Sequence, residues 1–117
     1  MPDAYSIRNR DSKTHVMLSW RLEGSNDLVN WICLDVRQHE PDNGHAMSIL
    51  CRPGATTTWG VDPTVCRRLG IVDGFNTFRL VQTSTNSEGG HHMSIGGLEL
   101  YGTPTNPEQW QIVNRVY

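Results

Sequence analysis

Apolar and polar residues alternate along several short stretches of the chain. Such alternation is typical of strands that bury one face against a core. The clearest stretch covers residues 16–23 and places Trp20 and Leu22 in the core. Shorter stretches with strand-like patterns are residues 4–8, 31–36, 47–51, 56–59, 78–82 and 95–101. The pattern therefore predicts an all-β protein built from antiparallel strands.

One short helix interrupts this pattern between residues 62 and 70. Asp62 is a residue type that caps helix N-termini, and Pro63 suits the first helical position. Gly70 stands where a helix commonly ends. We expect one or two helical turns between these signals.

The strand-like segments 78–82 and 95–101 are separated by a polar run. Phe78 and Leu80 share one face of the first segment, and residues 83–92 contain nothing that needs burial. We therefore expect the two segments to pair with each other across a loop of about ten residues.

Three motifs carry a resemblance to a known family. The chain reads Trp-Arg-Leu-Glu-Gly-Ser-Asn-Asp at residues 20–27 with Trp31 following, Phe-Arg-Leu-Val-Gln-Thr at 78–83, and Gly-Leu-Glu-Leu-Tyr-Gly at 97–102. In this order they resemble the discoidin domain, the type C module of coagulation factors five and eight. The resemblance implies an antiparallel β-sandwich with a galactose-binding-like jelly-roll fold. Family members usually have Gly after the Asp of the first motif, whereas this chain has Leu28, so the turn type is expected to differ.

The resemblance also divides the chain. Residues 1–103 are expected to form the discoidin-like sandwich, N-terminally short because the family has one or two strands before the segment that matches residues 5–8. Residues 104–117 are expected to be a C-terminal extension. Either residues 110–117 add a strand in the vacant position, or a second copy does so in a strand-exchanged dimer.

Length and charge narrow the function classes. A chain of 117 residues suits one domain with a single core. Its formal net charge of −2 argues against nucleic acid or an anionic membrane as the partner. No apolar run approaches the roughly 20 residues that span a bilayer.

The cysteines favour a reducing compartment. Cys33, Cys51 and Cys66 are an odd set without a Cys-x-x-Cys spacing, which indicates neither a disulfide framework nor a zinc site. Extracellular members of the resembled family usually bridge a cysteine near each terminus. We therefore expect an intracellular, cytoplasmic location within a larger protein, and we expect Cys33 to be a small core residue.

The alternation of strand directions places three polar loops at one end of the sandwich. These loops are residues 9–15, 37–45 and 83–92, and all five histidines fall within them. The resemblance implies that loops at this end contact ligands. The candidate contact residues are Arg10, Asp11, Lys13, His15, His39, Glu40, Asp42, Asn43, His45, Asn86, Ser87, Glu88, His91 and His92.

Two interpretations of the histidines compete. They could converge on a metal ion or change charge together near pH 6.5, or they could simply be polar loop residues. The chain offers no histidine pair at helical i, i+4 spacing and no His-x-His. His91 and His92 are adjacent, so on extended backbone they point to opposite faces. We therefore predict no metal site and no cofactor.

The motifs of the common enzyme classes are absent from the sequence. There is no Gly-x-Ser-x-Gly elbow, no His-Glu-x-x-His helix and no phosphate-binding loop.

The sequence predicts a non-catalytic binding module whose loops contact a protein partner, as the resemblance to intracellular discoidin-like domains also implies. The alternative is a carbohydrate-binding module that uses the same loops. These loops lack aromatic residues other than His, and the tryptophans Trp20, Trp31 and Trp59 are expected in the core, which favours the protein partner.

Overall fold

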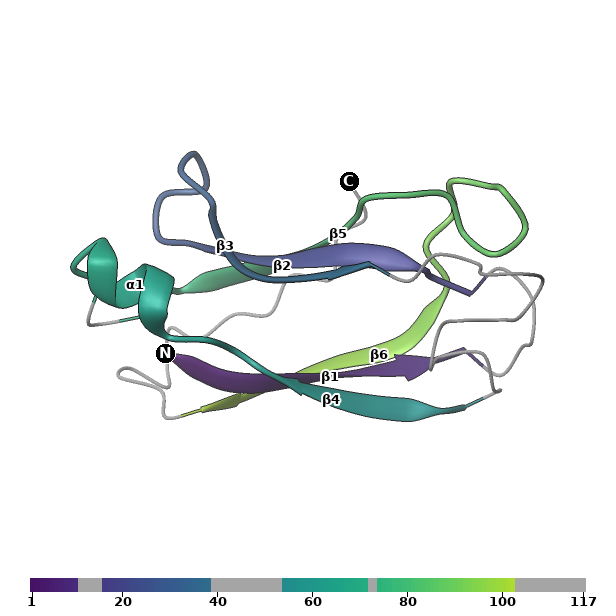
Figure 1. Ribbon diagram of the computed structural model, residues 1–117, viewed down its shortest axis with the longest axis horizontal. Coiled ribbons are helices and arrows are strands. Elements are labelled where there is room, and N and C mark those ends of the chain that lie inside the picture. Colours follow the sequence, from purple (N-terminus) through teal and green to yellow (C-terminus); the bar gives the residue numbers. More distant parts are fainter. Residues whose placement is uncertain (11–15, 39–53, 72–73, 103–117) are drawn as a thin grey trace.

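Two three-stranded antiparallel sheets pack face to face in the computed structural model (Figure 1), which describes residues 1–10, 16–38, 54–71 and 74–102. Sheet A has the strand order β4-β1-β6, and sheet B has the order β3-β2-β5. The elements are β1 (Pro2–Asn9), β2 (Ser19–Ser25), β3 (Ile32–Gln38), β4 (Thr56–Gly60), α1 (Thr64–Arg68), β5 (Thr77–Gln82) and β6 (Ile95–Gly102). The predicted antiparallel β-sandwich is confirmed.

The core lies between the sheets and is built from the inward positions of each strand. Trp20 and Leu22 of β2 are fully buried, as the alternation predicts. The ring of Trp59 packs edge-on against Trp20 at 5.0 Å and stacks on Tyr5 at 5.4 Å. Aromatic contacts of this geometry add to the burial of large apolar surfaces. Trp59 on β4 is therefore a core residue, as expected.

The expected pairing of the two strands around residues 83–92 is wrong. β5 pairs with β2, from Trp20 opposite Gln82 to Ser25 opposite Thr77. β6 pairs with β1 in the other sheet. Tight hairpin pairing is imposed by loops of two to five residues. The longer connection here leaves each strand free to join a different central strand, so that both apolar faces meet in the core.

The N-terminal part of the expected strand 16–23 is not a strand. Val16, Met17 and Leu18 are all buried, so burial does not alternate there, and β2 begins at Ser19. The backbone of Val16 pairs instead with Ser87: its N–H donates to Ser87 Oγ at 2.9 Å, and its carbonyl accepts from the Ser87 N–H at 2.9 Å. The expected strand 47–51 and the extension 104–117 lie outside the described residues.

The short helix α1 forms where the sequence predicts it. Asp62 Oδ1 accepts hydrogen bonds from the Thr64 N–H at 2.9 Å and from Thr64 Oγ1 at 2.6 Å. Pro63 rather than Asp62 occupies the N-cap position, a shift of one residue from the expectation. Gly70 ends the segment with a φ of +71°, a conformation that glycine adopts without strain. Among the described residues, no helix has the length and apolar character needed to cross a membrane.

The turn between β2 and β3 is shaped by Leu28 and by the side chains of Ser25 and Asp27. Leu28 has a φ of 63°, in the left-handed region that costs a side chain with a Cβ about 1 kcal/mol. Asp27 Oδ1 accepts the N–H groups of Val29 and Asn30, at 2.9 and 2.7 Å, and Ser25 Oγ accepts the Leu28 N–H at 3.0 Å. The hydrogen bonds from Asn30 and Val29 hold the pKa of Asp27 well below its usual range, and all of these contacts together offset the strain at Leu28.

Candidate functional site

Strands β1, β3 and β5 end at the same end of the sandwich, where β2 begins (Figure 1). The alternation of strand directions therefore locates the loop end correctly. Of the predicted loops, the structure describes Arg10, residues 37 and 38, which belong to β3, and the connection of residues 83–94. The other candidate residues, Asp11, Lys13, His15, His39, Glu40, Asp42, Asn43 and His45, lie outside the residues that the structure describes.

Asn86 shapes the described loop from within. Its side chain is only 2% exposed. Oδ1 accepts the N–H groups of Glu88 and Gly90, both at 3.0 Å, while Nδ2 donates to the His92 carbonyl at 3.1 Å. The backbone N–H of Asn86 also donates to the Gly90 carbonyl at 2.8 Å. Asn86 was predicted from sequence as a ligand contact, but its amide instead closes the loop on itself.

Ser87 fastens this loop to the segment that precedes β2. Its hydroxyl and N–H bond the backbone of Val16, as described above. Gln82 Nε2 adds a hydrogen bond to the His91 carbonyl at 3.2 Å, from the end of β5. The loop is therefore held from inside and at its flank by neutral hydrogen bonds.

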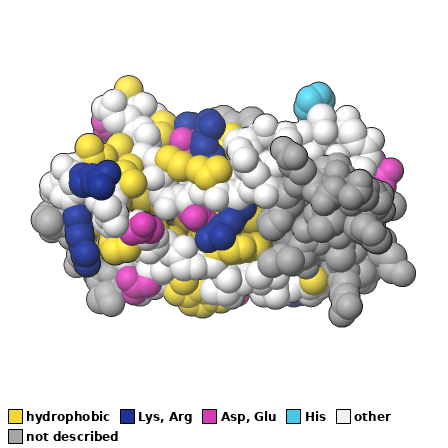
Figure 2. All heavy atoms as spheres, viewed as in Figure 1, with side chains coloured by type: hydrophobic (Ala, Val, Ile, Leu, Met, Phe, Trp, Pro, Cys, Tyr) yellow, Lys and Arg dark blue, Asp and Glu magenta, His cyan; other side chains and the backbone are white. Residues whose placement is uncertain are grey.

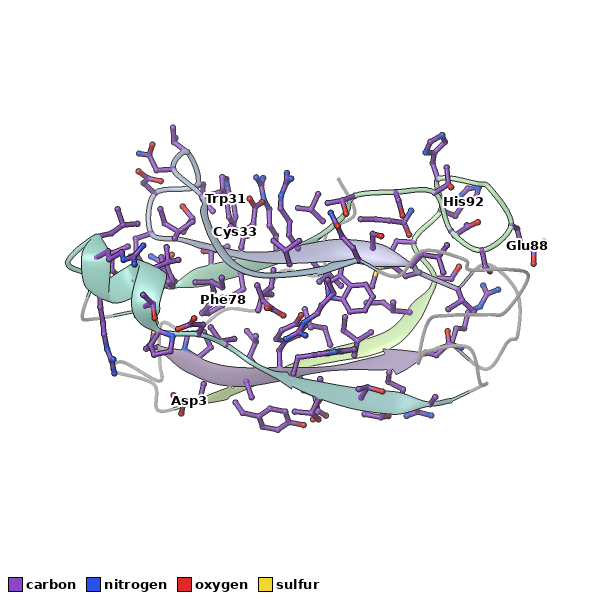
Figure 3. All side chains as sticks on the ribbon, in the orientation of Figure 1. Asp3, Trp31, Cys33, Phe78, Glu88 and His92 are labelled. Carbon is purple, nitrogen blue, oxygen red and sulfur yellow. The ribbon has the colours of Figure 1, made fainter. Side chains whose placement is uncertain are left out.

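Four candidate residues of this loop are exposed: Ser87, whose hydroxyl is bonded to Val16, and Glu88, His91 and His92. Glu88 and His92 point away from the sandwich (Figure 3), and a histidine projects from this end of the molecule (Figure 2). Arg10 is also exposed. Within the described part of the chain, no group of three His, Cys, Asp or Glu side chains is arranged to hold a metal ion. The loop can offer one carboxylate and two imidazoles to a partner from a fixed backbone.

Trp31 does not lie in the core, contrary to expectation. It is half-buried, and the guanidinium of Arg79 lies 3.9 Å from the centroid of its ring. Arg79 and Arg21 both approach the buried carboxylate of Glu23, with Nε–Oε distances of 2.6 and 3.2 Å. Trp31 precedes β3 and is therefore outside the alternation that buries Trp20. The outer face of sheet B thus carries an ion-pair network covered by stacking.

Cys33 is also on this outer face rather than in the core. It lies opposite the outward-facing Glu23 in the pairing of β2 with β3, and it is half-buried. Burial, and next the charge of Glu23, raises the pKa of the Cys33 thiol. Burial likewise raises the pKa of Cys66. The thiolate, which is the nucleophilic form, is therefore disfavoured at both residues.

A partly buried chain of polar groups links the two sheets. Trp20 Nε1 donates to Tyr5 Oη at 3.0 Å, Tyr5 Oη donates to Asp35 Oδ2 at 2.5 Å, and Arg37 Nε donates to the same oxygen at 2.9 Å. Burial and the Asp35 carboxylate raise the pKa of the Tyr5 phenol above its usual value. The phenol stays neutral and donates a hydrogen bond to Asp35, so this chain of hydrogen bonds connects the two sheets.

The outer face of sheet A holds functional groups that the sequence reasoning did not single out. Thr58, Ser6, Tyr101 and Glu99 form a line of hydrogen bonds across β4, β1 and β6. Since Leu98 is buried on β6, period-two alternation already places Glu99 and Tyr101 outward. Their position beside Ser6 and Thr58 depends on strand register, which local pattern does not provide.

No protein-family model matches this chain, and no solved structure matches it significantly. The fold defines its class as an all-β sandwich of two antiparallel sheets. The likeness of the motifs at residues 20–31, 78–83 and 97–102 to those of discoidin domains stays a prediction from the sequence.

Proposed function

We propose that this chain is a non-catalytic binding domain of a larger intracellular protein, and that it recognises a polypeptide partner through the loop end of the sandwich. The observation that carries the proposal is the loop of residues 83–94. Asn86 and Ser87 hold its backbone from within, while Glu88, His91 and His92 face solvent. A loop that is ordered before binding loses less conformational entropy when a partner docks.

The chemistry of the exposed loop residues favours a polypeptide. A carboxylate and two imidazoles can pair with the charged and amide groups of a protein surface. The run from Thr83 to His92 contains no Phe, Tyr or Trp, so it offers no aromatic platform for a sugar ring. This counts against the alternative of glycan binding by the same loop.

The interior chemistry favours binding without catalysis. The phenol of Tyr5 is hydrogen-bonded to Asp35, which also accepts from Arg37, so this carboxylate already has its partners. The pKa values of Cys33 and Cys66 are raised rather than lowered by their surroundings. None of these groups has the environment of an activated nucleophile or base.

The proposal is tested with the triple variant Glu88→Ala/His91→Ala/His92→Ala. A matched control, Arg67→Ala/Arg68→Ala, removes charged side chains from α1 at the opposite end of the molecule. Proteins captured from cell extract by the wild type are quantified by mass spectrometry, and the strongest is purified for calorimetric titration. We expect the loop variant to bind it at least roughly tenfold more weakly, and the control to bind it as the wild type does.

Equal binding by the wild type and the folded loop variant would reject the loop as the contact surface. A partner that binds the wild type and the loop variant but not the α1 control would place the interface at the end of the molecule that carries α1. Thermal unfolding of both variants shows whether each is folded before it is compared.

A further inference from the structure

The outer face of sheet A is a grid of nine outward-facing positions, none of which lies in the loop of residues 83–94. Strand register defines three rows across β4, β1 and β6. The rows are Gly60–Ala4–Tyr101, Thr58–Ser6–Glu99 and Thr56–Arg8–Gly97. Six of these residues are Gly, Ala, Ser or Thr. Only one aromatic ring, one carboxylate and one guanidinium therefore extend far above the backbone of the sheet.

A directed line of hydroxyl groups crosses this face. Ser6 Oγ donates to Tyr101 Oη at 3.1 Å, and Tyr101 Oη donates to Glu99 Oε2 at 2.8 Å. Because the Ser6 proton is used in this way, the 2.6 Å contact between Ser6 and Thr58 requires Thr58 Oγ1 to donate. Every proton therefore points towards the Glu99 carboxylate. Hydrogen bonds in such a chain polarise and strengthen one another.

The line of hydroxyls also fixes the ring of Tyr101. The Cα of Tyr101 is in the first row, whereas its hydroxyl bonds Ser6 and Glu99 in the second row. The ring must therefore lean along the sheet rather than stand away from it. It remains 44% exposed, which leaves an apolar ring surface open to solvent.

Two glycines beside these groups have no packing role. A Cβ added to Gly60 or Gly97 would meet no atom within 4 Å, and neither residue has a positive φ. The neighbouring Gly96 and Gly102 are different, because their Cβ would lie 2.9 Å from the Asn9 carbonyl and 2.5 Å from the Met1 carbonyl. Glycine weakens strands, and where packing does not require it, it often marks the close approach of a ligand.

We propose that this face binds a neutral oligosaccharide, with one sugar ring against Tyr101 and its hydroxyl groups on Glu99, Thr58 and Arg8. The formal charges of Arg8 and Glu99 cancel, which favours a neutral ligand over an ion. Of the contacts among described residues, Glu99 Oε1 receives no hydrogen bond and Arg8 forms no ion pair, so both can bond sugar hydroxyls. Gly60 and Ala4, in the same row as Tyr101, have no side chain or a small one, so a flat carbohydrate chain can approach the backbone beside the ring.

A polypeptide fits this face less well. Protein interfaces are usually anchored by several aromatic or apolar side chains at their centre. Here Tyr101 is the single large apolar side chain among the nine positions, and it is surrounded by hydroxyl groups and backbone. The site is separate from the loop of residues 83–94, so this inference and the proposed function can fail independently.

The test is a proton–nitrogen NMR titration of the full chain with five tetrasaccharides: cellotetraose, xylotetraose, mannotetraose, maltotetraose and β-1,4-galactotetraose. We expect saturable shifts with at least one of them, at Ser6, Thr58, Gly60, Gly97 and Tyr101. Tyr101→Ala should weaken this binding at least roughly tenfold, because it removes the stacking surface. Glu88→Ala in the loop should leave it unchanged.

A second variant guards against simple loss of folding. Gly60→Thr/Gly97→Thr adds side chains in open space and suits the strands, so we expect it to remain folded and to bind at least roughly tenfold more weakly. Unchanged binding by this variant would overturn the proposal, as would the absence of saturable shifts with all five sugars. Shifts confined to residues 83–94 would also overturn it, and so would a protein partner that requires Tyr101 when every sugar is inert.

Discussion

The outer faces of the two sheets differ in how far their polar side chains are paired with one another. On sheet B, Glu23 forms ion pairs with Arg21 and Arg79, and Arg79 stacks on Trp31. Long side chains therefore cover the backbone and pair with one another. On sheet A, small residues surround one leaning tyrosine, and the hydroxyl line ends at the exposed Glu99.

The difference teaches that exposure alone does not make a face available to a ligand. Both faces follow from the same strand alternation, and both carry charges. On sheet B the groups that could recognise a ligand are occupied by each other. On sheet A the corresponding groups keep part of their bonding capacity, which is why we place the sugar there.

The largest expected effect comes from Glu23. Glu23→Gln removes the negative charge that holds two guanidinium groups, so we expect the free energy of unfolding to fall by about 2 kcal/mol. The estimate is below that for fully buried pairs because Arg21 remains 42% exposed. Urea unfolding measures the loss.

The matched change on sheet A is Glu99→Gln. The Glu99 side chain is exposed and bonds one hydroxyl, so its loss should stay within about 0.5 kcal/mol. Equal losses for the two variants would remove the contrast between the faces.

The next largest expected loss of stability comes from substitution of Trp31. Trp31→Ala removes the ring beneath the Arg79 guanidinium, and we expect the free energy of unfolding to fall by about 1 kcal/mol. Trp31→Phe keeps a weaker ring and should retain part of that energy. Calorimetry of the three proteins in parallel would show whether the order is wild type, Phe, Ala; any other order argues against stacking as the cause.

The glycines of sheet A should respond in the opposite direction. Gly60→Thr and Gly97→Thr each reduce the entropy of the unfolded chain and place a strand-favouring side chain in open space. We expect each to raise the free energy of unfolding by about 0.5 kcal/mol. A destabilisation in urea unfolding would mean that packing, rather than ligand access, explains the glycines.

The smallest expected effect is a pH dependence of the stability that the turn between β2 and β3 contributes. Hydrogen bonds from the Asn30 and Val29 N–H groups lower the pKa of Asp27 in the folded state. The resulting stabilisation is therefore present above the unfolded-state pKa of about 3.9 and is lost as the pH falls below it. Unfolding free energies measured between pH 2 and 7 should show that the stability of the wild type relative to Asp27→Asn increases up to about pH 4 and is constant above it. A difference that does not change with pH would exclude the carboxylate as the source.

Much of the interior could be predicted from the sequence because burial repeats every second residue. This holds for Trp20 and Leu22 on β2 and for Phe78 and Leu80 on β5, all of which are buried. The direction of successive strands also located the loop of residues 83–94. Both inferences use only local periodicity and strand direction.

The rest depends on contacts between distant parts of the chain. Whether β5 pairs with β6 or with β2 is a matter of topology that the alternation of Phe78 and Leu80 leaves open. Trp31 lies outside the strand period, so its position over Arg79 could not be derived. The row that joins Gly60 to Tyr101 likewise requires the registers of two strand pairs.

The most direct test of the contrast between the faces measures stability and sugar affinity on the same protein, Gly60→Thr/Gly97→Thr. We predict that its free energy of unfolding rises above that of the wild type while its affinity for the tetrasaccharide that binds the wild type falls at least roughly tenfold. A double variant that is more stable and binds equally well, or a wild type that binds none of the five sugars, would contradict the assignment of sheet A as the open face.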